Sequence, residues 1–174
     1  GKYLAFTEGA SAPVMHLKTL ATAGLTHFQI LPANDIAGIE EDFSNQINLN
    51  NTVAELCAVK ANAPVCGVEN DGATLLSVYE SYDPSTEDAQ ALAESLRGLD
   101  GYNFGYDPKH FNAPDGSFAS NADGVTRILE MRAMNQALHE MGLRTSLDVV
   151  YNHTNSAGLW DNSVLDKVVP GYYS

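Results

Sequence analysis

The sequence predicts an α/β fold with a pair of parallel strands, on three observations. The composition is 44% hydrophobic and 18% charged over 174 residues, which is typical of one globular domain. Residues 12–31 show helical spacing, then a glycine, then a β-prone run, and residues 121–150 repeat that order. A strand, helix, strand succession implies a right-handed crossover between parallel strands.

The first of these segments reads as a helix followed by a strand. Ser11 is placed to cap a helix over 12–23. Pro13 suits the first turn of that helix, because proline lacks only an N–H that would be unpaired there. Gly24 is a good helix stop, and a β-prone strand over 26–31 follows it.

Residues 33–98 differ in composition, and we interpret them as a surface insertion between the two core segments. Acidic and amide residues dominate the first part of this insertion. Ser85 and Asp88 have the spacing of a capping box ahead of the best helical pattern. The three short stretches with helical spacing are 52–58, 72–81 and 86–97.

The second core segment pairs a helix over 121–141 with a strand over 143–150. Ser120 or Asn121 can cap this helix. Strands of parallel sheets are covered on both faces and are therefore apolar. Asp148 is unusual in such a strand, so it either caps backbone groups at the strand end or belongs to a functional site.

The two cysteines, Cys57 and Cys66, lie nine positions apart. They are a disulfide candidate, although two free thiols or part of a metal site are alternatives. Zinc usually takes four ligands from two close pairs, and no second pair exists here. A disulfide would indicate an exported protein. Residues 1–6 lack the pattern of a signal peptide, so we expect a mature form or a cut piece.

The charge balance excludes some classes of partner. Nine basic residues stand against 22 acidic ones, giving a formal net charge of -13. Nucleic acids and anionic membrane surfaces are bound through cationic side chains, so neither is expected as a partner. No apolar run reaches the roughly 18 residues that a membrane-spanning helix needs. A neutral substrate such as a sugar is compatible with this charge.

Two polar clusters follow the predicted core, at 102–108 and at 148–154. In parallel α/β folds the carboxyl ends of strands and the loops after them form the functional face. The aromatic residues offer flat faces to the C–H side of a sugar ring, and the Asn, Asp and His residues offer directional hydrogen bonds to hydroxyls. The alternative reading is that the histidine is structural and the aromatic residues belong to the core.

These clusters carry a resemblance to a known family. Residues 148–153, Asp-Val-Val-Tyr-Asn-His, resemble the first signature region of the α-amylase superfamily, glycoside hydrolase family 13. Residues 102–108 resemble the YNWGYDP motif of its pullulanase-type debranching enzymes, with Phe104 in place of Trp. Residues 24–32 and 163–173 are similar to other segments of those enzymes.

The resemblance implies that residues 1–174 are a segment of a (β/α)8 TIM barrel, with about two barrel strands and the insertion 33–98. It implies a parent enzyme that hydrolyses α-1,6-glucosidic branch linkages in pullulan, glycogen or starch limit dextrins by a retaining mechanism. The nucleophile and the acid/base would lie beyond Ser174, so the segment alone should be inactive. No cofactor is expected to be required.

The resemblance also suggests a role for each polar residue of the two clusters. Tyr106 would stack on a glucose, and His153 would hydrogen-bond the hydroxyls of that sugar. Asp107 would be a sugar ligand or a structural one. Asp148 would support the geometry of the site. Asn152 matches a position that binds a structural calcium in many α-amylases, which makes it a calcium candidate.

Two other functions stay open at this point. One is a superfamily enzyme of isoamylase or neopullulanase type, and the other is a non-catalytic glycan-binding module. The expected partners are an α-glucan and either the remainder of the parent catalytic domain or a second copy of the chain. The expected location is secreted or at the cell surface, by bacterial-type export.

Overall fold

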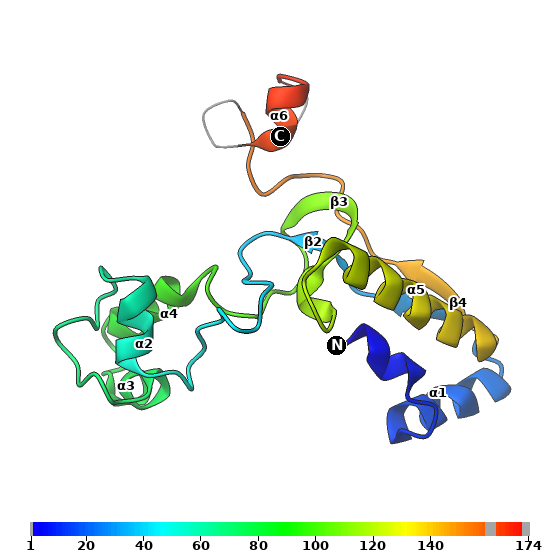
Figure 1. Cartoon of the computed structure of the whole chain (residues 1–174), viewed down its shortest axis with the longest axis horizontal. Coiled ribbons are helices and arrows are strands. Elements are labelled where there is room, and N and C mark those ends of the chain that lie inside the picture. The colour runs from blue at the N-terminus through cyan, green and yellow to red at the C-terminus, as the bar shows by residue number, and fades with distance from the viewer. Residues whose placement is uncertain (1, 159–162, 172–174) are drawn as a thin grey trace. The chain divides into compact units, whose positions relative to one another are not determined.

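The computed structural model describes residues 2–158 and 163–171 (Figure 1). Tyr172 and Tyr173, the end of the last family-like segment, lie outside the described residues. The chain forms two compact units, one of residues 1–37 with 103–174 and one of residues 38–102. The described part is a mixed α/β structure with two two-stranded sheets, which confirms the predicted class.

The first unit contains both sheets. Its elements are η1 (Tyr3–Thr7), α1 (Ala12–Thr22), β1 (His27–Ile30), β2 (Asn34–Ile36), β3 (Pro108–Pro114), η2 (Gly116–Phe118), α5 (Gly124–Glu140), β4 (Arg144–Leu147) and α6 (Val164–Val168). Strands β1 and β4 pair in parallel, in register from His27↔Arg144 to Ile30↔Leu147. The helix α5 packs on η1 and runs alongside β4 (Figure 1).

The parallel strands are shorter than the sequence predicted. The strand expected over 143–150 ends at Leu147, so Asp148 follows the strand instead of lying within it. One backbone bond, from Asp148 N to the carbonyl of Ile30 at 2.8 Å, extends the pairing. Pro32, two residues beyond Ile30, has no N–H to continue the ladder.

The second sheet was not predicted. Strands β2 and β3 are antiparallel, and their register is irregular on both sides of the pair Asp35↔His110. Strand β3 begins and ends with a proline and does not alternate apolar with polar residues. Both features weaken the sequence signal for a strand.

The core of the first unit lies between α5, η1 and the strands. Met134 and Leu138 on the buried face of α5 contribute to it. The Tyr3 hydroxyl donates to the carbonyls of Ala33 and Asp115, each at 3.2 Å. The buried apolar residues of this core are Tyr3, Ala33, Ala119, Met134, Leu138 and Leu143.

The cap of α5 also differs from the prediction. Neither Ser120 nor Asn121 caps the helix, because its N-cap is Asp123, whose Oδ2 accepts from Val125 N at 3.1 Å. The Ser120 backbone N instead donates to Glu130 Oε2 at 2.9 Å. The buried Glu130 carboxylate, about two turns into the helix, binds Ser120 instead, and no local sequence pattern reveals this contact.

The second unit packs three helices around its own core. They are α2 (Val53–Val59), α3 (Leu75–Ser81) and α4 (Asp88–Leu96). The fully buried members of this core are Val53, Leu56, Val65, Leu75 and Leu92. A disulfide joins Cys57 to Cys66, as the spacing of the two cysteines allows. In the described part of the chain, the helices are too short or too polar to cross a membrane.

The capping box of this unit lies at another position than expected. Thr52 Oγ1 accepts from Glu55 N at 3.3 Å, and Glu55 Oε2 accepts from Thr52 N at 2.6 Å. Ser85 does not cap α4, because both its N and its hydroxyl donate to Asp83, and the N-cap is Glu87. An Asx turn at Asp83 therefore takes the donors that a capping box would use.

Candidate functional site

Four of the five residues proposed for the site meet at the carboxyl ends of β1 and β4. The Tyr106 hydroxyl donates to Asp148 Oδ2 at 2.9 Å. The ring nitrogen Nε2 of His153 lies 2.9 Å from the Tyr106 carbonyl oxygen, and Asn152 lies beside His153. The structure thus joins two loops that are more than 40 residues apart in sequence.

The contacts of His153 define its tautomer. The Tyr106 carbonyl only accepts hydrogen bonds, so Nε2 carries the hydrogen. The Nδ1 atom then accepts from Asn152 Nδ2, 3.1 Å away. Both ring nitrogens are engaged within the chain, so a sugar hydroxyl would have to replace one of these partners. The hydrogen bond from His153 to a sugar stays a prediction.

Tyr106 presents its ring and not its hydroxyl. The side chain is 45% exposed, whereas the hydroxyl is committed to Asp148. That hydrogen bond, followed by desolvation and the Asp148 charge, raises the pKa of Tyr106 above its usual 10.0. The phenol is therefore protonated at neutral pH, and nearly half of the residue's surface remains exposed.

Two residues of the same loop, which sequence reasoning did not single out, hold Tyr106 in place. Asn103 Nδ2 donates to the carbonyl of Ala37, and Asn103 Oδ1 accepts from Gly105 N, both at 2.9 Å. Gly105 has φ +92°, and a Cβ there would lie 2.7 Å from the Pro32 carbonyl oxygen. The Asn-x-Gly order within the motif is the signal that could have indicated this turn.

Asp107 takes part in structure on both its backbone and its side chain. Its carbonyl accepts from Ala37 N at 2.9 Å. The Asn155 amide, in the orientation that satisfies both of its polar atoms, donates to both carboxylate oxygens of Asp107, at 3.0 and 3.1 Å. These contacts support a structural role, while a direct contact with sugar stays a prediction.

The site is an exposed edge of the first unit and not a deep cavity. A cavity of about 410 Å³ in that unit lies among η1, α1 and α5, away from Tyr106 and His153. Within residues 2–158 and 163–171, no three carboxylate, imidazole or thiolate ligands that include Asp148 or His153 come within 4.8 Å of one another. Calcium at Asn152 therefore stays a prediction, because one amide oxygen is far from the six to eight ligands that Ca²⁺ takes.

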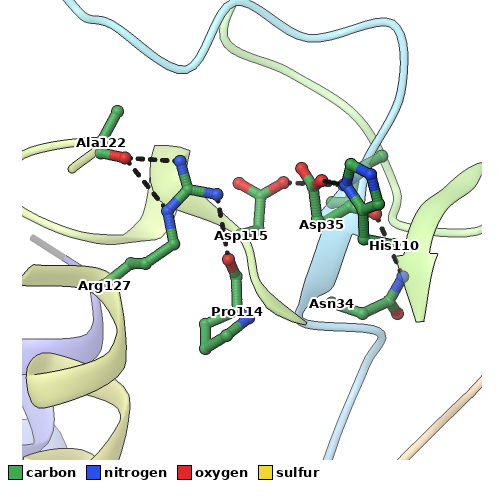
Figure 2. A network of polar contacts seen from close by, with 8 residues as sticks. Asn34, Asp35, His110, Pro114, Asp115, Ala122 and Arg127 are labelled. Carbon is green, nitrogen blue, oxygen red and sulfur yellow. Dashed lines mark hydrogen bonds and ion pairs between the residues drawn. The ribbon is translucent and has the colours of Figure 1, made fainter. Parts of the chain in front are cut away.

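A polar network lies behind this edge, between β2 and β3 (Figure 2). Asp35 on β2 contacts His110 on β3, and the buried Asp115 lies next to Asp35. Arg127 on α5 closes the network by donating to the carbonyls of Ala122 and Pro114. No motif in the sequence indicated this arrangement, and His110 has no neighbours in sequence that suggest a role.

The fold and the site together place the chain in a class. An α/β unit is interrupted by a compact helical unit, and its polar edge lies at the carboxyl ends of two parallel strands. The chain is thus of the mixed α/β class, and open α/β sheets bind their ligands at the carboxyl ends of the strands.

Comparisons with known proteins agree on the relatives of this chain. The model of the pullulanase Ins domain matches residues 36–102. A pullulanase of Klebsiella pneumoniae is 41% identical over 182 residues, which cover 99% of this chain and 17% of the relative. The chloroplastic pullulanase 1 of Arabidopsis thaliana is 39% identical over 99% of the chain and 15% of the relative.

A solved structure extends the comparison to the fold. The Klebsiella pneumoniae pullulanase complexed with maltotriose matches 99% of this chain and 17% of its own, with a TM-score of 0.75 and 39% identity. The chain is therefore a pullulanase-related segment that contains the Ins domain. It spans about a sixth of the length of these relatives.

Proposed function

We propose that this chain is the substrate-binding edge of a debranching glycoside hydrolase that cleaves α-1,6-glucosidic linkages in pullulan, glycogen or starch limit dextrins. The observation that carries the proposal is the 41% identity to a pullulanase over 99% of the chain, both polar clusters included. The joining of Tyr106, Asp148 and His153 into one edge supports it. Maltotriose, the sugar bound in a related structure, is the natural probe.

Catalysis in this proposal is retaining and uses carboxylates outside residues 1–174. Retaining glycosidases need a nucleophile and an acid/base about 5–5.5 Å apart. Asp148 accepts a hydrogen bond from Tyr106, which suits a supporting role and not that of a nucleophile. The role of this segment is therefore to bind and orient sugar.

The parallel strands support the finer proposal that the first unit is part of a (β/α)8 barrel. Strands of such barrels are covered on both faces, by barrel neighbours and by helices. Here Leu31, Leu147 and Val149 are apolar and exposed at the ends of β1 and β4. In a complete barrel, further strands would cover these apolar side chains.

The barrel proposal predicts association of the isolated chain. Unpaired strand edges and exposed apolar residues favour pairing with another chain. Light scattering should show a mass that rises with concentration. A compact monomer that unfolds cooperatively at low concentration would exclude the partial-barrel interpretation.

Release of reducing sugar from pullulan tests the activity. The complete protein should hydrolyse pullulan, and the 174-residue chain should not. Activity confined to amylopectin branches would indicate the isoamylase alternative. Maltotriose binding by a complete protein without any hydrolysis would indicate a glycan-binding module.

His153→Ala in the complete protein tests the site. Loss of a positioned hydrogen-bond donor should lower kcat by an amount equivalent to about 2–4 kcal/mol, while the melting temperature changes little. The matched control is His27→Ala, since His27 is exposed on β1 and its ring Nδ1 hydrogen-bonds the neighbouring Thr26 hydroxyl. Equal kinetics for the two variants would argue against the role of His153.

The disulfide supports a further part of the proposal, namely export from the cell. Disulfides such as Cys57–Cys66 persist in oxidising compartments and are rare in the cytosol. Fractionation of the native host, with detection of the protein outside the cytoplasm, tests this location.

A further inference from the structure

The ribbon formed by β2 and β3 has an irregular register. Its Cα partners are Asn34↔Pro114, Asp35↔His110 and Ile36↔Pro108, with an irregularity at each step. The side-chain pattern of a short, bulged strand does not by itself prevent a slip. The backbone bonds from Ala37 N to the Asp107 carbonyl, at 2.9 Å, and from Asp115 N to the Ala33 carbonyl, at 3.0 Å, hold the two ends of the ribbon, so its irregular middle needs a constraint from side chains.

The side chains of Asp35 and His110 supply that constraint. Nδ1 of His110 contacts Oδ2 of Asp35, and because a carboxylate only accepts, the hydrogen lies on Nδ1. The Asp35 side chain is 9% exposed and that of His110 is 51% exposed, so the contact reaches from the surface into the ribbon. Figure 2 shows the imidazole against one side of the Asp35 carboxylate, with Asp115 on the other.

Asp115 fixes the next position along β2. Its Oδ2 accepts from Ile36 N at 3.0 Å, and its Oδ1 accepts from Ser117 N at 2.8 Å. A carboxylate oxygen of Asp35 lies within 4.8 Å of one of Asp115, and both residues are buried. Two close buried carboxylates repel each other, so the donor from His110 offsets a cost that Asp35 would otherwise carry.

The ribbon leads directly to the proposed sugar edge. Strand β3 begins at Pro108, two residues after Tyr106, while the end of β1 is bonded to Asp148. A slip of one residue along a strand displaces the chain by about 3.4 Å. That displacement would separate the Tyr106 hydroxyl from Asp148 Oδ2, which lie 2.9 Å apart.

We infer that His110 and Asp35 are positioning residues, whose contact sets the register of β3 and thereby places Tyr106 against Asp148 at the sugar-binding edge. The expected effect on sugar binding rests on the proposed function. The placement of Tyr106 does not depend on that function and is measured separately.

The test compares His110→Leu, which removes the donor, with His110→Asn, whose amide nitrogen can occupy the place of Nδ1. His139→Leu is the matched control, because His139 is also exposed and its ring Nε2 hydrogen-bonds a side chain, that of Thr145. Asp35→Leu is a second variant, which keeps a branched side chain of similar size and removes the acceptor for His110 Nδ1. Each is made in the complete protein, with the melting temperature as a check of folding.

Two readouts are taken on each variant. The first is the titration of Tyr106, followed by NMR of ¹³C-labelled tyrosine rings and assigned with Tyr106→Phe. The second is the Kd for maltotriose. In His110→Leu and Asp35→Leu the Tyr106 pKa should fall towards 10.0, and the Kd should rise about fivefold or more. His110→Asn should restore both readouts, and His139→Leu should change neither.

The outcomes separate the inference from the proposed function. An unchanged Tyr106 titration in folded His110→Leu overturns the inference, even where maltotriose binds. A shifted titration in a protein that never binds maltotriose supports the positioning role and removes the proposed function. If His110→Leu does not fold, an unchanged titration in Asp35→Leu overturns the inference in the same way.

Discussion

The phenol hydroxyl of Tyr106 donates to Oδ2 of Asp148 at 2.9 Å, and so ties the loop before β3 to the residue after β4. The same tyrosine is held at its backbone by His153, whose Nε2 donates to the Tyr106 carbonyl. Because the side chain and the backbone are both anchored, the exposed ring keeps one orientation. A fixed aromatic face is what stacking on a sugar requires.

Substitution of Tyr106 should separate the ring from the hydroxyl. Tyr106→Ala removes the face and should weaken maltotriose binding about tenfold or more, equivalent to about 1.4 kcal/mol. Tyr106→Phe keeps the face and loses one hydrogen bond, so its loss should be smaller, on the order of 1 kcal/mol or less. Titration calorimetry on the complete protein measures both. Equal losses would mean that the hydroxyl, and not the ring, contacts the sugar.

Gly105→Ala should disturb the loop that carries Tyr106. The substitution places a side chain at φ +92° and brings its Cβ to 2.7 Å from the Pro32 carbonyl. Gly24→Ala is the matched control, since Gly24 has φ +109° but nothing within 4 Å of a Cβ. Denaturant unfolding should show a loss of unfolding free energy for Gly105→Ala that exceeds the loss in the control by about 1–3 kcal/mol. Similar losses would show that the close approach to Pro32 is relieved at little cost.

The capping box of α2 should make this helix sensitive to acid. The Thr52 backbone N–H, and then its side chain, lower the pKa of Glu55 below its usual 4.5. A depressed folded-state pKa stabilises the fold above 4.5, and this contribution is lost as the pH falls through the lowered value. The hydrogen-exchange protection factors of the α2 amides should fall over that range, and Glu55→Gln should remove this response.

Two further variants control the capping-box prediction. Thr52→Ala should destabilise α2 by about 1 kcal/mol at neutral pH, because it removes the acceptor for Glu55 N. Glu80→Gln changes an exposed carboxylate on α3 and should leave the acid response of α2 in place. An acid response that survives in Glu55→Gln would assign it to other carboxylates of the unit.

Reduction of the Cys57–Cys66 disulfide should destabilise the second unit. The disulfide closes a loop of about ten residues and so lowers the entropy of the unfolded chain. This effect stabilises the fold by about 2–3 kcal/mol. Proteolysis within residues 57–66 should therefore become faster after treatment with dithiothreitol. The double variant Cys57→Ser, Cys66→Ser should be cleaved at the faster rate with or without the reductant. A rate that reduction does not alter would mean that the packed core alone holds this loop.

The elements that the sequence predicted are those with a local signal. Apolar spacing indicated α1 and α5, and a glycine after each helix indicated where it stops. The β-prone runs indicated β1 and β4, which pair in parallel as expected. Tyr106 and His153 were proposed as site residues in the same way, from their neighbours in the sequence motifs, and their contact with sugar stays a prediction. Periodicity and short motifs relate residues that are a few positions apart. Helices and short strands can be predicted from them because these elements depend mainly on such local relations.

Only the tertiary structure decided how those elements and motifs meet. The β2–β3 ribbon joins Asp35 to His110, 75 positions away, and neither strand has an apolar alternation that would reveal it. The bond from Tyr106 to Asp148 and the tautomer of His153 likewise depend on loops that approach only in the folded chain. A single sequence carries residue types and spacings but no distances between remote residues, so packing determines such contacts.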